Sequence, residues 1–234
     1  MDIDSIDRDR HPSKRQICEG CGNLTRRMNG TIINTPVDAS VQGCEIAPWP
    51  ERLAGLWRYK DVTVRIAVGS DHAGFALKEY LKPRLKDAGV EIVDCGCNSA
   101  DRVDYLEYTL GVAWELVSGH CELGIVVCGN GYGMAMVANR IPGIRAAICH
   151  DAFTARTSKE AGDSNIISLG ARVVGPELAW DLVQIWLKAE FKGKTVHRYA
   201  RRLEELAKLE RLIAAAGWQD ALEKYMSNRA EQQA

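Results

Sequence analysis

The stretch LGIVVCGNGYG, residues 123–133, decides the fold. The run from Leu123 to Cys128 carries no charge, which is typical of a strand buried on both faces. A turn with glycine at 129, 131 and 133 follows, and a helical pattern comes after it. The stretch therefore predicts a strand, a tight turn and a helix.

The same order of elements continues on both sides of this stretch. The expected strands are 64–69, 90–95, 123–128, 144–149 and 165–169, and the expected helices are 75–89, 105–117, one ending near 142, 152–160, 177–190 and one reaching about 216. Parallel neighbours need crossover helices, so this alternation predicts an α/β fold with a doubly wound, parallel, Rossmann-like sheet of five strands.

Three parts are expected along the chain. Residues 1–60 sustain no helical or alternating period and are interpreted as a poorly ordered N-terminal extension, compatible with a regulatory arm, an interface strap or upstream sequence before the true start. Residues 61–218 form the α/β domain, including the C-terminal helix, and 219–234 a polar tail. In that helix Leu203, Leu206, Leu209 and Leu212 form one stripe, which fits either a dimer contact or core packing.

Composition limits the classes of function. Thirty basic residues face 31 acidic ones, so no global field draws the chain to nucleic acid or anionic lipid. No apolar run reaches membrane length and the first residues do not resemble a signal peptide, which predicts a cytoplasmic protein without a membrane partner. The eight cysteines lie mostly in or beside apolar runs, which favours reduced thiols over a disulfide framework.

The glycine turn after Cys128 predicts an anion-binding cradle. Open α/β sheets bind ligands outside the carboxyl ends of their strands, and glycines allow amide N–H groups to face negative charge there. A dinucleotide fingerprint would need glycine at 134, where Met134 stands, so the pattern disfavours a nicotinamide cofactor.

A second strand end carries the titratable pair Asp71 and His72 within GSDHAG, residues 69–74. The pair fits a ligand cleft. It also fits a structural role, with Asp71 capping the next helix and His72 exposed in the turn.

Cys128 ends a strand just before a helix, where a thiolate can serve as base or nucleophile. Cys121 and Cys149 are interpreted as packing residues. Cys18 and Cys21 form half of a zinc-knuckle pattern, and the only further candidate ligands nearby are Cys44 and His11. No metal site is therefore predicted, and a nucleic-acid module in this segment is disfavoured.

Three other features stand near expected strand ends or on a helix. Arg198 and Arg202 are four apart and share a helix face, where they fit a phosphate clamp or a solvated charged face. Tyr105 and Asn139 lie near loops and, taken alone, fit loop or cap chemistry equally well.

Together these motifs resemble the type B ribose-5-phosphate isomerases and their galactose-6-phosphate isomerase relatives. The matching motifs are residues 69–74, Asp104-Tyr105, 128–133, Ala138-Asn139-Arg140, 142–146 and 165–175. The resemblance covers about residues 64–205. The resemblance implies a metal-free, cofactor-free aldose–ketose isomerisation of a phosphorylated sugar through a cis-enediolate. It also implies a homodimer, with tetramers left open, whose sites lie between subunits.

The resemblance also implies a role for each site residue. Cys128 is the base, and Asp71 and His72 bind sugar hydroxyls and assist ring opening. The remaining implied residues are Gly129, Asn130, Gly131, Tyr132 and Gly133 as the enediolate cradle, Tyr105 and Asn139 as substrate contacts, and Arg172, Arg198 and Arg202 at the phosphate.

One departure from the family bears on the substrate. Relatives carry His-Asn-Asp before the last strand, and the histidine helps to open the sugar ring, but here Ala161-Gly162-Asp163 stands there. Alanine exchanges no proton, so ring opening falls to His72, to water or to nothing. A tetrose 4-phosphate cannot close a furanose ring, so a four-carbon substrate is the alternative to ribose 5-phosphate. A hexose 6-phosphate and a non-catalytic sugar-phosphate sensor also remain open.

Overall fold

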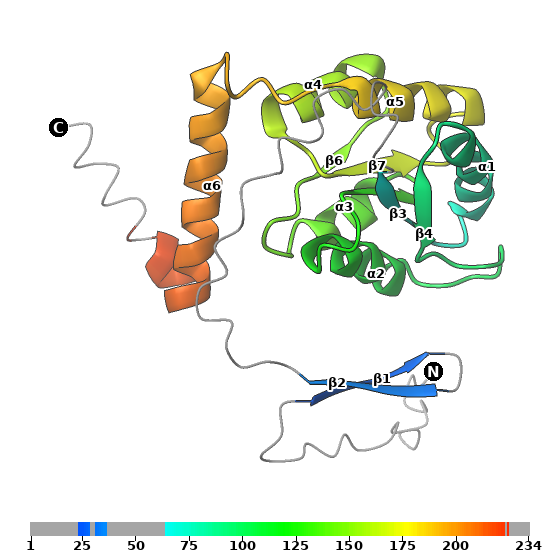
Figure 1. Cartoon of the computed structure of the whole chain (residues 1–234), viewed down its shortest axis with the longest axis horizontal. Coiled ribbons are helices and arrows are strands. Elements are labelled where there is room, and N and C mark those ends of the chain that lie inside the picture. Colours follow the sequence, from blue (N-terminus) through cyan, green and yellow to red (C-terminus); the bar gives the residue numbers. More distant parts are fainter. Residues whose placement is uncertain (1–22, 29–30, 37–63, 223, 225–234) are drawn as a thin grey trace, which may run out of the picture. The chain divides into compact units, whose positions relative to one another are not determined.

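The computed structural model describes residues 23–28, 31–36, 64–222 and 224 (Figure 1). The chain divides into two compact units, 1–49 and 50–234. In the first, β1 (Asn23–Met28) and β2 (Thr31–Pro36) pair antiparallel. This hairpin was not expected, although an Asn-Gly pair at 29–30 is a strong hairpin signal. The other expectations for 1–60, including Cys18 and Cys21, lie outside the described residues.

The second unit is built on one parallel sheet of five strands in the order β4-β3-β5-β7-β6. This confirms the predicted doubly wound α/β fold. The strands are β3 (Arg65–Ser70), β4 (Glu91–Asp94), β5 (Leu123–Cys128), β6 (Ala146–Ile148) and β7 (Ile166–Gly170). The edge strand β6 is shorter than predicted, and because it pairs only with β7 its residues are not fully buried.

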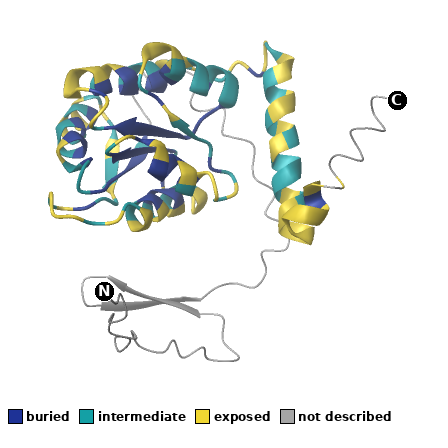
Figure 2. Ribbon diagram, turned by 180° about the vertical axis from the view of Figure 1, so that it is seen from behind, coloured by how far each residue is buried: buried dark blue, intermediate teal, exposed yellow. Residues whose placement is uncertain are grey.

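Helices cover both faces of this sheet. The first face carries α1 (Phe75–Asp87), α4 (Ala152–Gly162) and α5 (Pro176–Lys188), and the second carries α2 (Leu106–Val117) and α3 (Tyr132–Ala138) (Figure 1). The central strands β5 and β7 are buried throughout their length, as the dark blue arrows show (Figure 2). Burial on both faces explains their near-continuous apolar sequence.

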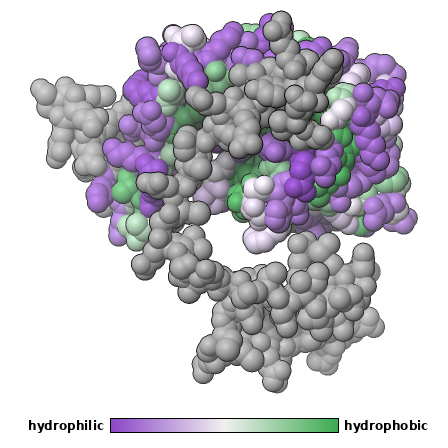
Figure 3. Space-filling model, viewed as in Figure 1, coloured by the Kyte–Doolittle hydropathy of each residue, from purple (hydrophilic) through white to green (hydrophobic). Residues whose placement is uncertain are grey.

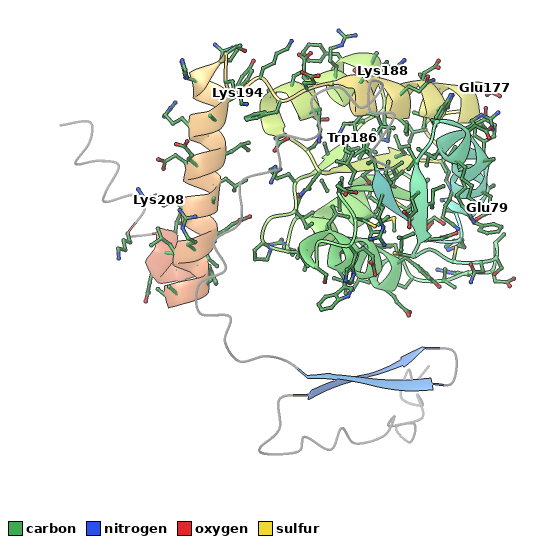
Figure 4. The ribbon with its side chains drawn as sticks, in the orientation of Figure 1. Glu79, Glu177, Trp186, Lys188, Lys194 and Lys208 are labelled. Carbon is green, nitrogen blue, oxygen red and sulfur yellow. The ribbon has the colours of Figure 1, made fainter. Side chains whose placement is uncertain are left out.

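A buried polar cluster anchors α4 and α5 to the amino end of β7. Trp186 lies inside the α/β unit on α5 (Figure 4), and its Nε1 donates a 2.7 Å hydrogen bond to Ser164 Oγ. Lys159 Nζ donates to Ser164 O at 3.0 Å and lies 5.3 Å from the centre of the Trp186 ring. Burial lowers the pKa of Lys159 to about 8. The cluster fixes the chain immediately before β7.

The C-terminal helix α6 (His197–Ala216) has no buried residue. It meets α4, and Glu210 Oε2 accepts a 3.3 Å hydrogen bond from Gly143 N, just before β6. Core packing within the subunit, one of the two roles considered for its leucine stripe, is therefore not seen. Residues 218–222 are helical, and the predicted tail beyond residue 224 lies outside the described part.

None of the helices in the described ranges is long and apolar enough to cross a membrane.

Candidate active site

The site lies at the carboxyl ends of β3 and β5, where the topology opens a crevice. From β3 the chain moves outward to β4 and then returns to β5 on the other side of β3. The connections that leave β3 and β5 therefore diverge, which is where open α/β sheets bind ligands. Asp71 N donates to Val127 O at 3.2 Å and joins the two strand ends.

Asp71 and His72 are both held by the backbone. Asp71 is buried, and its Oδ1 accepts hydrogen bonds from Ala73 N and Gly74 N, both at 2.9 Å. The cap considered for Asp71 is not formed, because the N-cap of α1 is Gly74 and receives no side-chain hydrogen bond. Asp71 Oδ1 instead holds the turn before α1, while Oδ2 has no such bond to the described residues. His72 Nδ1 lies 3.0 Å from Val103 O, which orients the ring and leaves Nε2 for a ligand.

Cys128 is buried at the end of β5, and its sulfur receives a directed amide. Gly131 N donates to Cys128 Sγ at 3.2 Å. This contact depends on a φ of +84° at Gly131, a conformation that side chains rarely adopt. The amide is oriented to stabilise negative charge on the sulfur.

Beside the sulfur the turn presents further amides. The N–H groups of Gly129, Asn130, Tyr132 and Gly133 donate no hydrogen bond to any described residue. Tyr105 reaches this turn because residue 133 is glycine: a Cβ there would lie 3.1 Å from Tyr105 Cζ. The side chains of Asn130 and Tyr132 are exposed. The predicted cradle residues and Tyr105 are thus brought together.

Arg172 adds positive charge to the cradle from the end of β7. Its amide donates to Gly129 O at 2.9 Å. Its Cδ, Nε and Cζ lie 3.5 Å from where a Cβ of Gly129 would be. An exposed guanidinium in this position suits an anionic group bound above the turn.

Three predicted residues are not brought to this crevice within one chain. Both amide atoms of Asn139 bind the backbone of Ala146, at 2.8 and 2.9 Å, at the amino end of β6 and so at the opposite edge of the sheet. Arg198 and Arg202 are exposed on α6, whose described contacts are with α4 and Gly143. Their roles at a substrate stay predictions, and position 161 in α4 likewise lies toward the amino ends.

The other thiols near the sheet are unsuited to base chemistry. Burial raises the pKa of the Cys121 thiol to about 11, and burial raises that of Cys149 to about 11 as well. Cys97, Cys121, Cys128 and Cys149 form no disulfide. Across the described ranges, no group of three or more His, Cys, Asp or Glu side chains is placed to hold a metal ion.

Two residues at this edge were missed by the sequence analysis. Ser168 Oγ donates to Gly131 O, and His150 Nε2 lies 3.2 Å from where a Cβ of Gly131 would be. Ser168 lies in β7, and His150 lies in the loop after β6. The rule that drew attention to Asp71 and Cys128 therefore applied to His150 too.

A doubly wound sheet with a thiol, an imidazole and free amides at its switch point defines an α/β enzyme with a small-molecule site. The ribose/galactose isomerase family model matches residues 66–206. The chain is 39% identical over 146 residues to ribose-5-phosphate isomerase B of Escherichia coli, covering 62% of this chain and 96% of that protein. It is 38% identical over 129 residues to D-erythrulose-4-phosphate isomerase of Pectobacterium atrosepticum, covering 55% and 85%.

A solved structure agrees with these relatives. Ribose-5-phosphate isomerase B of Clostridium thermocellum has a TM-score of 0.61 and 45% identity, and the match covers 63% of this chain and 98% of that one. The chain belongs to the ribose/galactose isomerase family. It is an isomerase, as the resemblance predicted.

Gly131→Ala tests the turn against a neighbouring glycine. The left-handed φ alone should cost about 1–2 kcal/mol of unfolding free energy, and the new methyl would meet Gly170 N, Leu169 C and His150 at 3.2 Å. Gly129→Ala is the control, since its methyl meets only the Arg172 side chain, at 3.5 Å. We expect Gly131→Ala to lower both the denaturation midpoint and isomerase activity more than Gly129→Ala does; equal losses would contradict the role of the turn.

Proposed function

We propose that this chain interconverts an aldose and a ketose that carry a phosphate. Ribose 5-phosphate and ribulose 5-phosphate are the substrate pair that we favour. The observation that carries the proposal is the hydrogen bond from Gly131 N to Cys128 Sγ beside amides that donate no hydrogen bond to any described residue. Relatives named ribose-5-phosphate isomerase B, at 39% and 45% identity, support this sugar.

In the proposed reaction Cys128, as the thiolate, removes the proton from C2 of the open-chain aldose. The C2 electron pair forms the C1–C2 double bond, and the carbonyl electrons move to O1, which gives an enediolate. The sulfur then returns the proton to C1 while O2 becomes the ketone oxygen and O1 is protonated. The amides of Gly129, Asn130, Tyr132 and Gly133 stabilise the oxygen charge as it develops, which is an electrostatic contribution.

The other residues of the crevice orient the sugar. Asp71 Oδ2 is available to accept a sugar hydroxyl because Oδ1 already holds the backbone. His72, fixed through Nδ1, offers Nε2 to the ring oxygen or a hydroxyl. Arg172 supplies positive charge for the phosphate at the same edge.

Cys128→Ala separates an isomerase from a sugar-phosphate sensor. Without the sulfur there is no base, so we expect kcat to fall by at least about 10³-fold. The amides and Arg172 remain, so calorimetric binding of a phosphorylated sugar acid should change little. Turnover at the wild-type rate would eliminate Cys128 as the base, and a wild-type protein that binds but never turns over would be a sensor.

A four-carbon sugar phosphate is the second candidate substrate. Ala161 offers no group that exchanges a proton, and an open-chain tetrose 4-phosphate needs no ring opening. The relatives named for ribose 5-phosphate and for erythrulose 4-phosphate are 39% and 38% identical, so identity does not choose between them.

An assay of both sugars with the variant Ala161→His decides this. If the tetrose is the substrate, kcat/KM for erythrose or erythrulose 4-phosphate exceeds that for ribose 5-phosphate in the wild-type chain. In that case Ala161→His should improve ribose 5-phosphate selectively, because in the dimer proposed below an imidazole at 161 would supply the missing acid to the site of the other chain. A clear preference of the wild type for ribose 5-phosphate would reject the four-carbon substrate.

We further propose a homodimer in which each site takes residues from both chains. On α2 an exposed apolar stripe consists of Leu106, Leu110, Trp114 and Val117, and Trp114 is 55% exposed. Hydrophobic patches are visible on the surface in green (Figure 3). Arg198 and Arg202 stand away from their own cradle on a helix with no buried residue. A second copy that covers the stripe can supply these arginines to the phosphate.

Mixed dimers test this arrangement. Cys128→Ala and the double variant Arg198→Ala, Arg202→Ala should each be inactive, but after dissociation and random reassociation about one quarter of wild-type activity should return, because half of the dimers then hold one intact site. Mixing Cys128→Ala with Asp71→Ala is the control, because both residues come from the same chain and no intact site forms. No recovery in the first mixture would place the arginines in their own chain's site.

The thiols of Cys97, Cys121, Cys128 and Cys149, which form no disulfide, fit a reducing compartment, and we propose a cytoplasmic location on that ground.

A further inference from the structure

His150 stands at the same edge of the sheet as the proposed base but on another strand. It follows β6 and reaches past the end of β7 to the turn after β5. A Cβ on Gly131 would lie 3.2 Å from His150 Nε2 and equally far from Gly170 N. The imidazole is therefore packed against the one residue of the turn that has a left-handed conformation and binds the sulfur.

The nitrogen at this contact has no protein partner. His150 is half-buried, but its Nε2 is shielded from solvent and has no hydrogen bond to any described residue. Buried polar atoms in native proteins are generally paired, and an exception needs a reason. An apolar side chain would fill the same space without leaving a nitrogen unpaired, so packing alone does not explain an imidazole here.

Gly131 connects this nitrogen to the chemistry. Its N–H donates to Cys128 Sγ, and its carbonyl accepts from Ser168 Oγ. The sulfur and the imidazole thus contact the same residue. Any group that fixes Gly131, or that places positive charge beside it, acts on the sulfur through a single residue.

We propose that His150 is a positioning residue for Cys128: with a proton on Nε2, its imidazole holds the Gly131 turn and stabilises negative charge on the sulfur behind it. This inference rests on the proposed role of Cys128 as the base. His150 does not touch the sugar in this arrangement. It determines how much of the sulfur is present as thiolate and how well the Gly131 amide is aimed at it.

The charged groups around His150 are few. Asp151, the next residue, caps α4, and the hydrogen bond from Thr154 N is the main cause that lowers the pKa of its carboxyl, with His150 a lesser one. Arg172 lies at the end of β7, over Gly129. Cys128 faces the turn from β5. Asp151 and Arg172 carry charges of opposite sign, so the experiment must measure the sulfur itself.

The test measures the alkylation rate of Cys128 by iodoacetamide against pH, followed on its peptide by mass spectrometry, in substrate-free protein. In His150→Leu we expect the pH midpoint of alkylation to rise by about one unit, and kcat to fall about 10–100-fold with KM little changed. His150→Gln, which restores an N–H donor near Nε2, should recover most of both. His120→Ala is the control, because His120 is exposed and pairs with Glu115.

Two results would overturn the inference. If kcat falls but the alkylation midpoint of Cys128 does not move, His150 acts on the substrate directly. If neither changes, His150 only fills space. Because alkylation needs no sugar, a wild-type enzyme that rejects ribose 5-phosphate would refute the proposed substrate and leave this measurement valid. Comparable thermal denaturation of the Leu and Gln variants shows that both are folded.

Discussion

The site depends on a constraint at Gly131. Its φ of +84° turns the N–H back onto the Cys128 sulfur, and Ser168 holds the carbonyl on the opposite side. Because the amide is used in this way, the turn cannot relax into an ordinary helix start, and α3 begins only at Tyr132. A single glycine conformation therefore positions the proposed base and leaves the neighbouring amides without a hydrogen bond to the described residues.

The candidate site residues lie at opposite ends of the parallel strands. The carboxyl edge of one chain carries Asp71, His72, Cys128 and Arg172, whereas Asn139 is engaged at the amino end of β6. In a parallel sheet every strand runs in the same direction, so the residues at the amino ends and those at the carboxyl ends lie on opposite sides of the sheet within one subunit. A family motif that spans both ends of the strands fits the proposed site between two chains, which also uses the α2 stripe and α6.

Prediction from sequence worked where one local rule decides the outcome. Long apolar runs identified β5 and β7 because burial on both faces leaves no room for polar residues. It was less accurate at β6, where pairing with a single neighbour limits the strand to three residues. Asp71 illustrates a different limit: the sequence suggested a cap for the next helix or a ligand contact, and only the structure shows that Oδ1 holds the turn before α1 and caps no helix. The strand-end rule also applied to His150, but its contact with Gly131 joins the loops after β6 and β5, and that pairing is visible only in the structure.

The departure at positions 161 and 162 can be separated from the stability of the fold. Asp163, next in the chain, has a φ of 45° and binds Arg145 Nη2 through Oδ2 at 2.8 Å, close to Lys159. Burial raises the pKa of Asp163, although both basic neighbours oppose that shift. This residue therefore has a structural task that needs a carboxylate.

Positions 161 and 162 are less constrained than Asp163. A Cβ at Gly162 would meet no atom within 4 Å, and Ala161 is only half-buried. The fold accepts many side chains at these two positions, so stability does not require alanine or glycine there, and the proposed choice of sugar is the reason we give for the missing imidazole.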